Sequence, residues 1–214
     1  MGNKIIAIGV LVIMFCSCNN KTNSQPVNQA KLGGELIEEA YRQGNWDLII
    51  SVGDTLIGDD DPHNIAIAYA EALAAKGNYE KAINVLNRKI TQQPEDYYLY
   101  QTKGNVFAVA EKYDSAIANY DIVIEMKPTN ARPYINEGEI YEFLGEKEKA
   151  IKKYMVATYL FARNNFEAEA REMERRILRL DPDYKDVKEL MHDMGLEKVF
   201  KQMKRWDWIK FLGI

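Results

Sequence analysis

Cysteine is nearly absent from this chain: of 214 residues, only Cys16 and Cys18 are cysteines, and both lie near the N-terminus. The chain after Cys18 therefore forms no disulfide within itself and carries no thiol chemistry. With 47% hydrophobic and 28% charged residues, the composition is that of a folded soluble protein and excludes wholesale disorder. A fold built from this part of the chain must be held together by its apolar core.

Histidine is equally scarce, and the two histidines, His63 and His192, form no pair at metal-ligand spacing. The acidic run 58–61 lacks the spacing and the terminal glutamate of a calcium loop. Nucleophile elbows, phosphate-binding loops and dinucleotide fingerprints are also missing. We therefore predict that the protein is not an enzyme, with no catalytic residue, no metal site and no cofactor.

An excess of positive charge is lacking as well, because 28 Lys and Arg residues stand against 32 Asp and Glu residues, a formal net charge of −4. Nucleic-acid binding calls for a basic domain or stripe. This balance predicts that nucleic acid is not a partner.

A long apolar run does occur near the N-terminus, where Lys4 is followed by the apolar residues 5–15. One positive charge, an apolar stretch and a small residue at its exit are typical of a secretory signal peptide. A transmembrane helix needs about 20 apolar residues, so this run is too short to anchor the protein by itself.

The end of this run, Cys16-Ser17-Cys18, resembles a bacterial lipoprotein signal. In that family the cysteine is acylated and becomes the first residue of the mature chain, and Cys18 is the better candidate because the small Ser17 precedes it. The resemblance implies a signal peptide over residues 1–17 and an exported protein. It would be anchored through lipid on Cys18 to the cell membrane or outer membrane, facing the periplasm or the surface. The alternative is a plain signal peptide with incidental cysteines.

Residues 18–29 are rich in Asn, Gln, Ser and Thr and contain Pro26, so they are too polar to bury surface. We expect them to form a flexible tether.

An internal repeat organises the chain beyond the tether. Three segments align in steps of 34 residues, namely 77–82 (GNYEKA), 111–116 (EKYDSA) and 145–150 (GEKEKA). Pro94 and Pro128 each follow the last residue of such a segment by twelve positions, and a related Gly-Asn-Trp lies at 44–46. A fixed period of this length indicates stacked helical hairpins.

The repeat resembles the tetratricopeptide pattern, most fully over residues 97–130. The matching residues there are Tyr100, Gly104, Phe107, Ala116, Tyr120 and Pro128. The resemblance implies an all-α fold, a right-handed superhelical solenoid of helix-turn-helix repeats with C-terminal capping helices. Its units are 30–62, 63–96, 97–130 and 131–164, and residues 165–214 are expected to supply the capping helices and a basic aromatic tail.

Small residues recur where the two helices of a hairpin must approach closely. They are Ala70, Gly104 and Gly138 on the first helices and Ala82, Ala116 and Ala150 on the second. A larger side chain there is expected to overpack the contact at a cost of about 1–3 kcal/mol. The glycines before Asn45 and Asn78 suit a left-handed turn that ends a helix.

Tetratricopeptide arrays bind partners in a concave groove lined by the first helices of the repeats, and the resemblance implies the same here. The expected groove residues are Glu71, Tyr98, Gln101, Asn105, Arg132, Ile135, Glu139, Glu142 and Phe143. The three glutamates favour a partner with a basic or amide-rich surface. Asn105 and Asn136 fit part of the carboxylate-binding pattern of chaperone-binding members. Gln101 and Glu71 depart from it, so that specificity is not carried over.

The tail around residues 205–212 holds two of the three tryptophans among basic residues. Trp206, Trp208, Lys210 and Phe211 are its candidate contact residues. Three hypotheses remain: the tail folds back as a cap, docks to a partner protein, or contacts a membrane surface.

Together these features predict a membrane-tethered interaction scaffold or adaptor that holds protein partners of the bacterial cell envelope. Neither a particular partner nor an oligomeric state follows from the sequence. The alternative is a lipoprotein that captures a glycan or peptide, which a large pocket lined by exposed aromatics would favour. An enzyme is the third hypothesis, favoured by paired carboxylates in a deep cleft.

Overall fold

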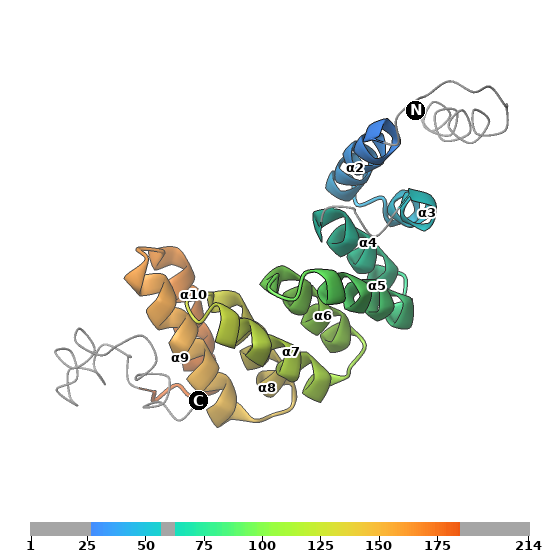
Figure 1. Cartoon of the computed structure of the whole chain (residues 1–214). Coiled ribbons are helices and arrows are strands. Elements are labelled where there is room, and N and C mark those ends of the chain that lie inside the picture. The colour runs from blue at the N-terminus through green and yellow to red at the C-terminus, as the bar shows by residue number, and fades with distance from the viewer. Residues whose placement is uncertain (1–26, 57–62, 185–214) are drawn as a thin grey trace, which may run out of the picture.

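Helices make up the regular structure of the part of the chain that the computed structural model describes, residues 27–56 and 63–184 (Figure 1). These residues form nine helices and no strand. The helices are α2 (Val27–Arg42), α3 (Trp46–Leu56), α4 (His63–Ala75), α5 (Tyr79–Gln92), α6 (Tyr97–Val109), α7 (Tyr113–Met126), α8 (Ala131–Phe143), α9 (Lys147–Arg163) and α10 (Glu167–Leu180).

Consecutive helices pair into hairpins, which stack in chain order along the curved row seen in Figure 1. The hairpins are α2 with α3, α4 with α5, α6 with α7 and α8 with α9, and α10 packs against α9. The predicted all-α, right-handed solenoid of tetratricopeptide-like repeats is thereby confirmed. The signal peptide, most of the tether and the basic aromatic tail lie outside the described residues.

The turns inside the hairpins share one geometry. Gly44, Gly77 and Gly145 have φ angles of 64°, 79° and 76°, which glycine adopts without steric cost. The next residue closes each turn with a backbone hydrogen bond five residues back, for example from Asn78 N to the oxygen of Leu73 at 2.8 Å. This 6→1 bond defines a Schellman end. The left-handed turns predicted at Gly44 and Gly77 are thus present.

The connections between hairpins end one helix and start the next. α5 ends two residues before Pro94, and α7 ends two residues before Pro128. Asp96 and Asn130 then serve as N-caps, and their side chains accept hydrogen bonds from the backbone N–H of Tyr98 and Arg132, at 3.0 and 3.1 Å. Each cap satisfies an N–H group that the first turn of a helix leaves without a partner.

The small residues of the first helices make room for side chains of the second. A Cβ atom on Gly104 would lie 2.5 Å from the ring of Tyr120, and one on Gly138 would lie 2.6 Å from the ring of Tyr154. The close approach predicted at these glycines is therefore one of a helix backbone to an aromatic ring. In the preceding repeat the equivalent positions hold Ala70 and Leu86, both fully buried. A larger residue on the first helix is accompanied there by a smaller one on the second.

The core runs along the solenoid in two main clusters. One extends from Ile37 to Val106 and covers α2–α6, and the other extends from Ile124 to Ile177 and covers α7–α10. A small cluster of Ala116, Tyr120 and Ile140 lies between them. Each hairpin therefore buries its apolar face against its neighbours, as expected of a repeat array.

Candidate functional site

The first helices of the hairpins, α2, α4, α6 and α8, contact one another in sequence and, together with α10, form one continuous surface, here called the first-helix face. Side-chain contacts connect each pair of neighbours along it. They are Tyr41 with Glu71, His63 with Asp96, Asn136 with Asn105, Arg176 with Glu139, and Arg179 with Glu142. The predicted groove residues belong to these helices.

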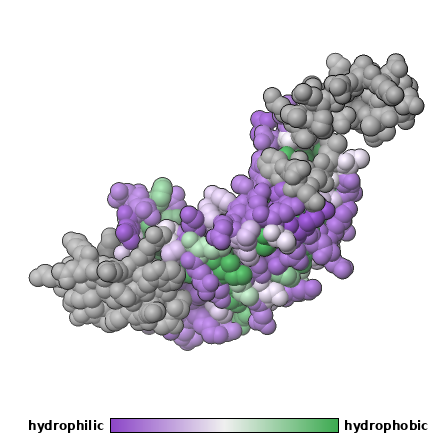
Figure 2. Space-filling model, in the orientation of Figure 1, coloured by the Kyte–Doolittle hydropathy of each residue, from purple (hydrophilic) through white to green (hydrophobic). Residues whose placement is uncertain are grey.

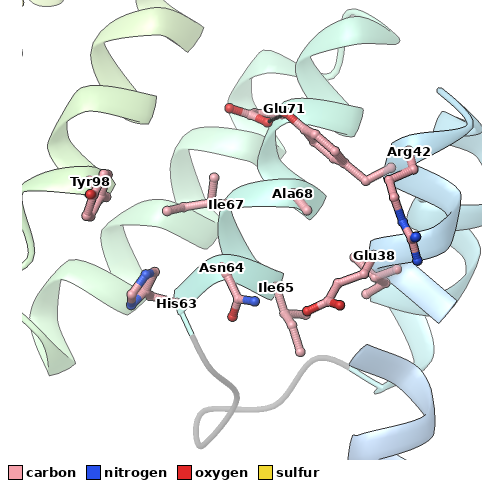
Figure 3. A pocket seen from close by; sticks show the side chains of 11 residues that line it. Glu38, Arg42, His63, Asn64, Ile65, Ile67, Ala68, Glu71 and Tyr98 are labelled. Atoms are coloured by element: carbon pink, nitrogen blue, oxygen red, sulfur yellow. Dashed lines mark hydrogen bonds between the residues drawn. The ribbon is translucent and has the colours of Figure 1, made fainter. Parts of the chain in front are cut away.

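A hollow of about 510 Å³ opens on this face between α2, α4 and the start of α6, here called the N-terminal hollow (Figure 3). It is lined by Ile37, Glu38, Tyr41, Arg42, His63, Asn64, Ile65, Ile67, Ala68, Glu71 and Tyr98. In Figure 3, Tyr98 and His63 lie on one side, Glu38 and Arg42 lie on the other, and Ile67 and Ala68 lie between them. Its volume and partly apolar lining are typical of a ligand site.

Aromatic rings stand at both ends of the N-terminal hollow. The Tyr41 hydroxyl donates a hydrogen bond to Glu71 at 2.6 Å, and this bond to a carboxylate raises the pKa of Tyr41 to about 12. At the other end the Tyr98 ring stacks on His63, with ring centres 6.0 Å apart, and His63 Nδ1 lies 3.0 Å from the Asp96 carboxylate. Tyr41 and Tyr98 remain 44% and 51% exposed, so their ring surfaces are accessible.

Carboxylates outnumber cations around the N-terminal hollow. Glu38 and Glu71 line it, whereas Arg42 is the one arginine or lysine in its lining and lies 2.7 Å from Glu39. The floor is apolar, because Ile37, Ile65 and Ala68 are buried. The arrangement suits a chain segment that offers apolar side chains together with a positive charge.

The middle of the first-helix face carries a hydrogen-bonded network centred on the amide of Asn105. The Oδ1 atom of Asn105 accepts hydrogen bonds from Asn136 and Tyr120, both at 2.9 Å, and a longer one from Gln101 at 3.4 Å. The other amide atom of Gln101, Oε1, is buried without a hydrogen-bond partner. The network ties α6 to α7 and α8, so Asn105 has a structural role in addition to the binding role predicted for it.

The C-terminal part of the face is covered by arginines from α10. Arg176 and Arg179 lie 2.6 Å from the carboxylates of Glu139 and Glu142, respectively. Glu142 also accepts a hydrogen bond from the Tyr154 hydroxyl at 2.8 Å. Glu139 and Glu142, two of the three glutamates predicted to attract a basic partner, are therefore already paired with arginines of this chain.

The remaining predicted residues are spread along the face. Arg132 is exposed and Ile135 is half-buried. Phe143 is 74% exposed at the end of α8, where its ring centre lies 5.4 Å from that of Tyr113.

Figure 2 shows a largely hydrophilic surface on the visible side, with hydrophobic residues gathered near its middle. Of the nine predicted groove residues, the structure brings Glu71 and Tyr98 together at the N-terminal hollow.

The lipidation candidate Cys18 and the tail candidates Trp206, Trp208, Lys210 and Phe211 lie outside the described residues. The sequence prediction missed Glu38, Tyr41 and Arg42 of α2. The unit 30–62 keeps only the turn and the final Asp-Pro of the repeat pattern, so no repeat position marks these residues.

A second hollow, of about 690 Å³, lies between α3 and α5 and is lined by Gly53, Asp54, Tyr69, Lys81, Asn84, Val85 and Arg88. The Asp54 carboxylate there accepts the Tyr69 hydroxyl and pairs with Lys81 at 2.7 Å. We assign the candidate site to the N-terminal hollow, because it lies on the first-helix face and has an apolar floor of Ile37, Ile65 and Ala68.

The described part of the chain holds no group of three or more His, Cys, Asp or Glu side chains arranged to bind a metal ion. None of its helices combines the length and the apolarity needed to cross a membrane.

No protein-family model matches the chain. Among curated proteins, it is 26% identical to a TPR repeat-containing protein of Treponema pallidum (strain Nichols) over 132 residues, which are 61% of this chain and 16% of that protein. It is 33% identical to human Tetratricopeptide repeat protein 6 over 95 residues, which are 44% of this chain and 18% of that protein. The chain thus spans less than a fifth of the length of these two relatives.

Among solved structures, the chain is similar to MamA AMB-1, with a TM-score of 0.51 and 16% identity over 78% of this chain and 98% of that one. This likeness shows the fold, a tetratricopeptide-like solenoid.

Proposed function

We propose that this protein is a membrane-tethered scaffold of the bacterial cell envelope that holds a segment of a partner protein on its first-helix face. The observation that carries the proposal is the N-terminal hollow, where an apolar floor, two accessible tyrosine rings and an acidic rim meet. A few apolar anchors that fill a pocket, surrounded by polar contacts, supply most of the affinity of a protein interface.

The membrane tether is proposed from the sequence. Lys4, the apolar residues 5–15 and the Ser17-Cys18 pair resemble a lipoprotein signal, and the polar residues that follow suit a flexible connection. A lipid on Cys18 would confine the solenoid near one membrane and raise its effective concentration for partners there.

A site-specific photo-crosslinking experiment tests the scaffold. A photoreactive amino acid replaces Asn64, which lines the N-terminal hollow and is exposed, and the matched control replaces the exposed Lys152 on α9. We expect the probe at position 64 to capture one or a few defined proteins in bacterial membranes, and the probe at position 152 to leave them uncaptured. Capture of the same proteins at both positions, or of none at position 64, would contradict the proposal.

The tether is tested in the same cells. Cys18→Ala should move the protein from the membrane fraction to the soluble fraction and reduce capture at position 64. A Cys16→Ala variant is the matched control and should remain with the membrane. Retention of the Cys18→Ala variant in the membrane fraction would contradict acylation at Cys18.

The second candidate function, capture of a glycan or peptide ligand, is favoured by the same two accessible rings, Tyr41 and Tyr98. A free ligand would bind the purified chain without a protein partner. Calorimetric titration with a mixed glycan pool separates the two functions, since a scaffold that docks peptide segments gives no heat with glycans, whereas a glycan-binding protein would give heats that Tyr98→Ala abolishes.

A further inference from the structure

We propose that residues 205–214 of this chain, the basic aromatic tail, dock into the N-terminal hollow of the same molecule and compete there with the partner. The inference rests on the proposed function, because it takes the hollow to be a peptide-docking site. The hollow then selects segments that are both apolar and basic, and the tail of the same chain competes with the partner for it.

The lining of the N-terminal hollow suits a segment with apolar side chains next to a positive charge. Its floor is formed by Ile37, Ile65 and Ala68, and the carboxylates of Glu38 and Glu71 stand on its rim. Opposite charges across an interface steer association and reject like-charged partners. The accessible Tyr41 and Tyr98 rings can also receive a cation on their faces.

The tail offers this combination. The segment Arg205-Trp206-Asp207-Trp208-Ile209-Lys210-Phe211-Leu212 holds five large apolar residues, two cations and a single carboxylate. Tryptophan and arginine are the residues that most often dominate the energy of an interface. The chain therefore carries a peptide whose charge and apolar content complement its own hollow.

The connection is long enough for docking within one molecule. From α10, near whose end Tyr184 lies, to α4 is three steps between first helices. Twenty residues separate Tyr184 from Arg205, and an extended chain of this length reaches up to about 65 Å, well beyond the width of three helices at about 10–12 Å each. A linker of this length gives an effective concentration in the millimolar range, so even a weak site would be largely occupied.

A peptide-binding experiment tests the proposal on the purified chain. The probe is a fluorescein-labelled peptide of residues 203–214, titrated by anisotropy against the full chain and against a chain lacking 205–214. We expect the shortened chain to bind the peptide at least about tenfold more tightly, because the attached tail competes in the full chain.

Charge reversals locate the site. Glu38→Lys combined with Glu71→Lys should weaken peptide binding to the shortened chain by about tenfold or more. The matched control is Glu80→Lys with Glu125→Lys, two exposed glutamates on the second helices α5 and α7, and it should leave binding unchanged. Circular dichroism verifies that each variant is folded. Glu71→Gln removes the charge but can still accept the Tyr41 hydrogen bond, so this variant tests the effect of the charge alone and should weaken peptide binding less than the double variant.

A photoreactive amino acid at position 208 of the full chain should crosslink to peptides of α2 or α4 within one molecule. The proposal is overturned if the labelled peptide does not bind the shortened chain or binds the two double variants equally. It is also overturned if deletion of 205–214 only lowers the melting temperature, as for a cap. Binding of the peptide to vesicles of phosphatidylglycerol but not to the chain, or dimers that vanish with the tail, would overturn it too. Partner capture at position 64 in a chain lacking 205–214 takes place with no competing tail, so its failure there contradicts the proposed function and is distinguishable from these outcomes.

Discussion

Gly104 and Tyr120 illustrate how single residues set the spacing of the hairpins. The ring of Tyr120 occupies the space that a Cβ on Gly104 would need, 2.5 Å away. Gly104→Ala should therefore force a rigid, fully buried ring to shift and lower the free energy of unfolding by about 1–3 kcal/mol. Urea denaturation of the variant and the parent measures this difference.

The neighbouring repeat supplies the compensating change, because it pairs Ala70 with Leu86. Tyr120→Leu alone should also destabilise, since it removes buried ring surface and the hydrogen bond to Asn105. In a double-mutant cycle, Gly104→Ala with Tyr120→Leu should be less destabilised than the sum of the single variants. Strict additivity would show that the two side chains do not compete for the same space.

Glu137 makes the stability of the solenoid dependent on pH. The residue is fully buried, and Lys153 Nζ contacts its carboxylate. Burial outweighs the attraction of Lys153, and the nearby Asp121 adds repulsion, so the pKa of Glu137 rises from 4.5 to about 7. The folded state therefore binds a proton that the unfolded state releases near pH 4.5.

This shift has a definite sign. Stability contributed by the protonated carboxyl is complete below about pH 4.5 and is lost as the pH rises to about 7, a loss on the order of 3 kcal/mol. Glu137→Gln should flatten this part of the stability profile, as measured by urea denaturation between pH 4.5 and 7.5. The exposed Glu125→Gln should leave the slope unchanged, and an unchanged slope in Glu137→Gln would contradict the assignment.

At this scale the sequence predicts the turns only in part. The glycines at 44, 77 and 145 occupy left-handed positions, and two of them were predicted from the Gly-Asn pairs. Glu111 occupies the equivalent position with a φ of 59°. A glutamate does not predict a left-handed turn, because residues other than glycine seldom adopt a positive φ. The burial of Glu137 is likewise invisible in the sequence, because it depends on how α8 is rotated against α7 and α9.

At the scale of elements, α10 extends the first-helix face beyond the predicted repeats. α9 has 17 residues where α5 and α7 have 14. α10 begins 36 residues after the start of α8, two positions later than the 34-residue period predicts. The pairs Arg176–Glu139 and Arg179–Glu142 join residues 37 apart. The period alone therefore could not align α10 with the first helices, and its arginines were not predicted to cover the two glutamates.

The packing of α10 can be tested on one helix. Ile177 is buried in the C-terminal core cluster, whereas its neighbour Leu178 is 46% exposed. Ile177→Ala should lower the free energy of unfolding by about 2–5 kcal/mol, and Leu178→Ala should change it by less than about 0.5 kcal/mol. Thermal or urea denaturation measures both, and equal effects would show that α10 does not pack as described.

At the scale of the whole molecule, the two main core clusters predict regional stability. Helices α2–α6 share one cluster and α7–α10 the other, and the small cluster around Tyr120 lies between them. Repeat arrays are stabilised by contacts between neighbours, so a local defect weakens its own region most. Gly138→Ala should therefore speed amide hydrogen exchange in α8–α10 more than in α4 and α5, as mass spectrometry can measure. Uniform acceleration would indicate a single cooperative unit.

The period and the small residues were enough to predict the solenoid and the face that carries the site. They placed Glu71 and Tyr98 on that face, and both line the N-terminal hollow. The contribution of α2 escaped prediction because the first unit has lost most of the repeat pattern. Its Tyr41 meets Glu71 only through the stacking of one hairpin on the next.

The matched sizes of facing residues have a consequence for how such an array can be rearranged. A first helix with glycine at the contact needs a second helix with tyrosine, and one with alanine accompanies leucine. Exchanging a lone helix between units would create either a void or a clash, whereas moving a complete hairpin would carry both complementary halves along. Recombination, natural or engineered, should thus tolerate whole-unit shuffling far better than helix-by-helix grafting.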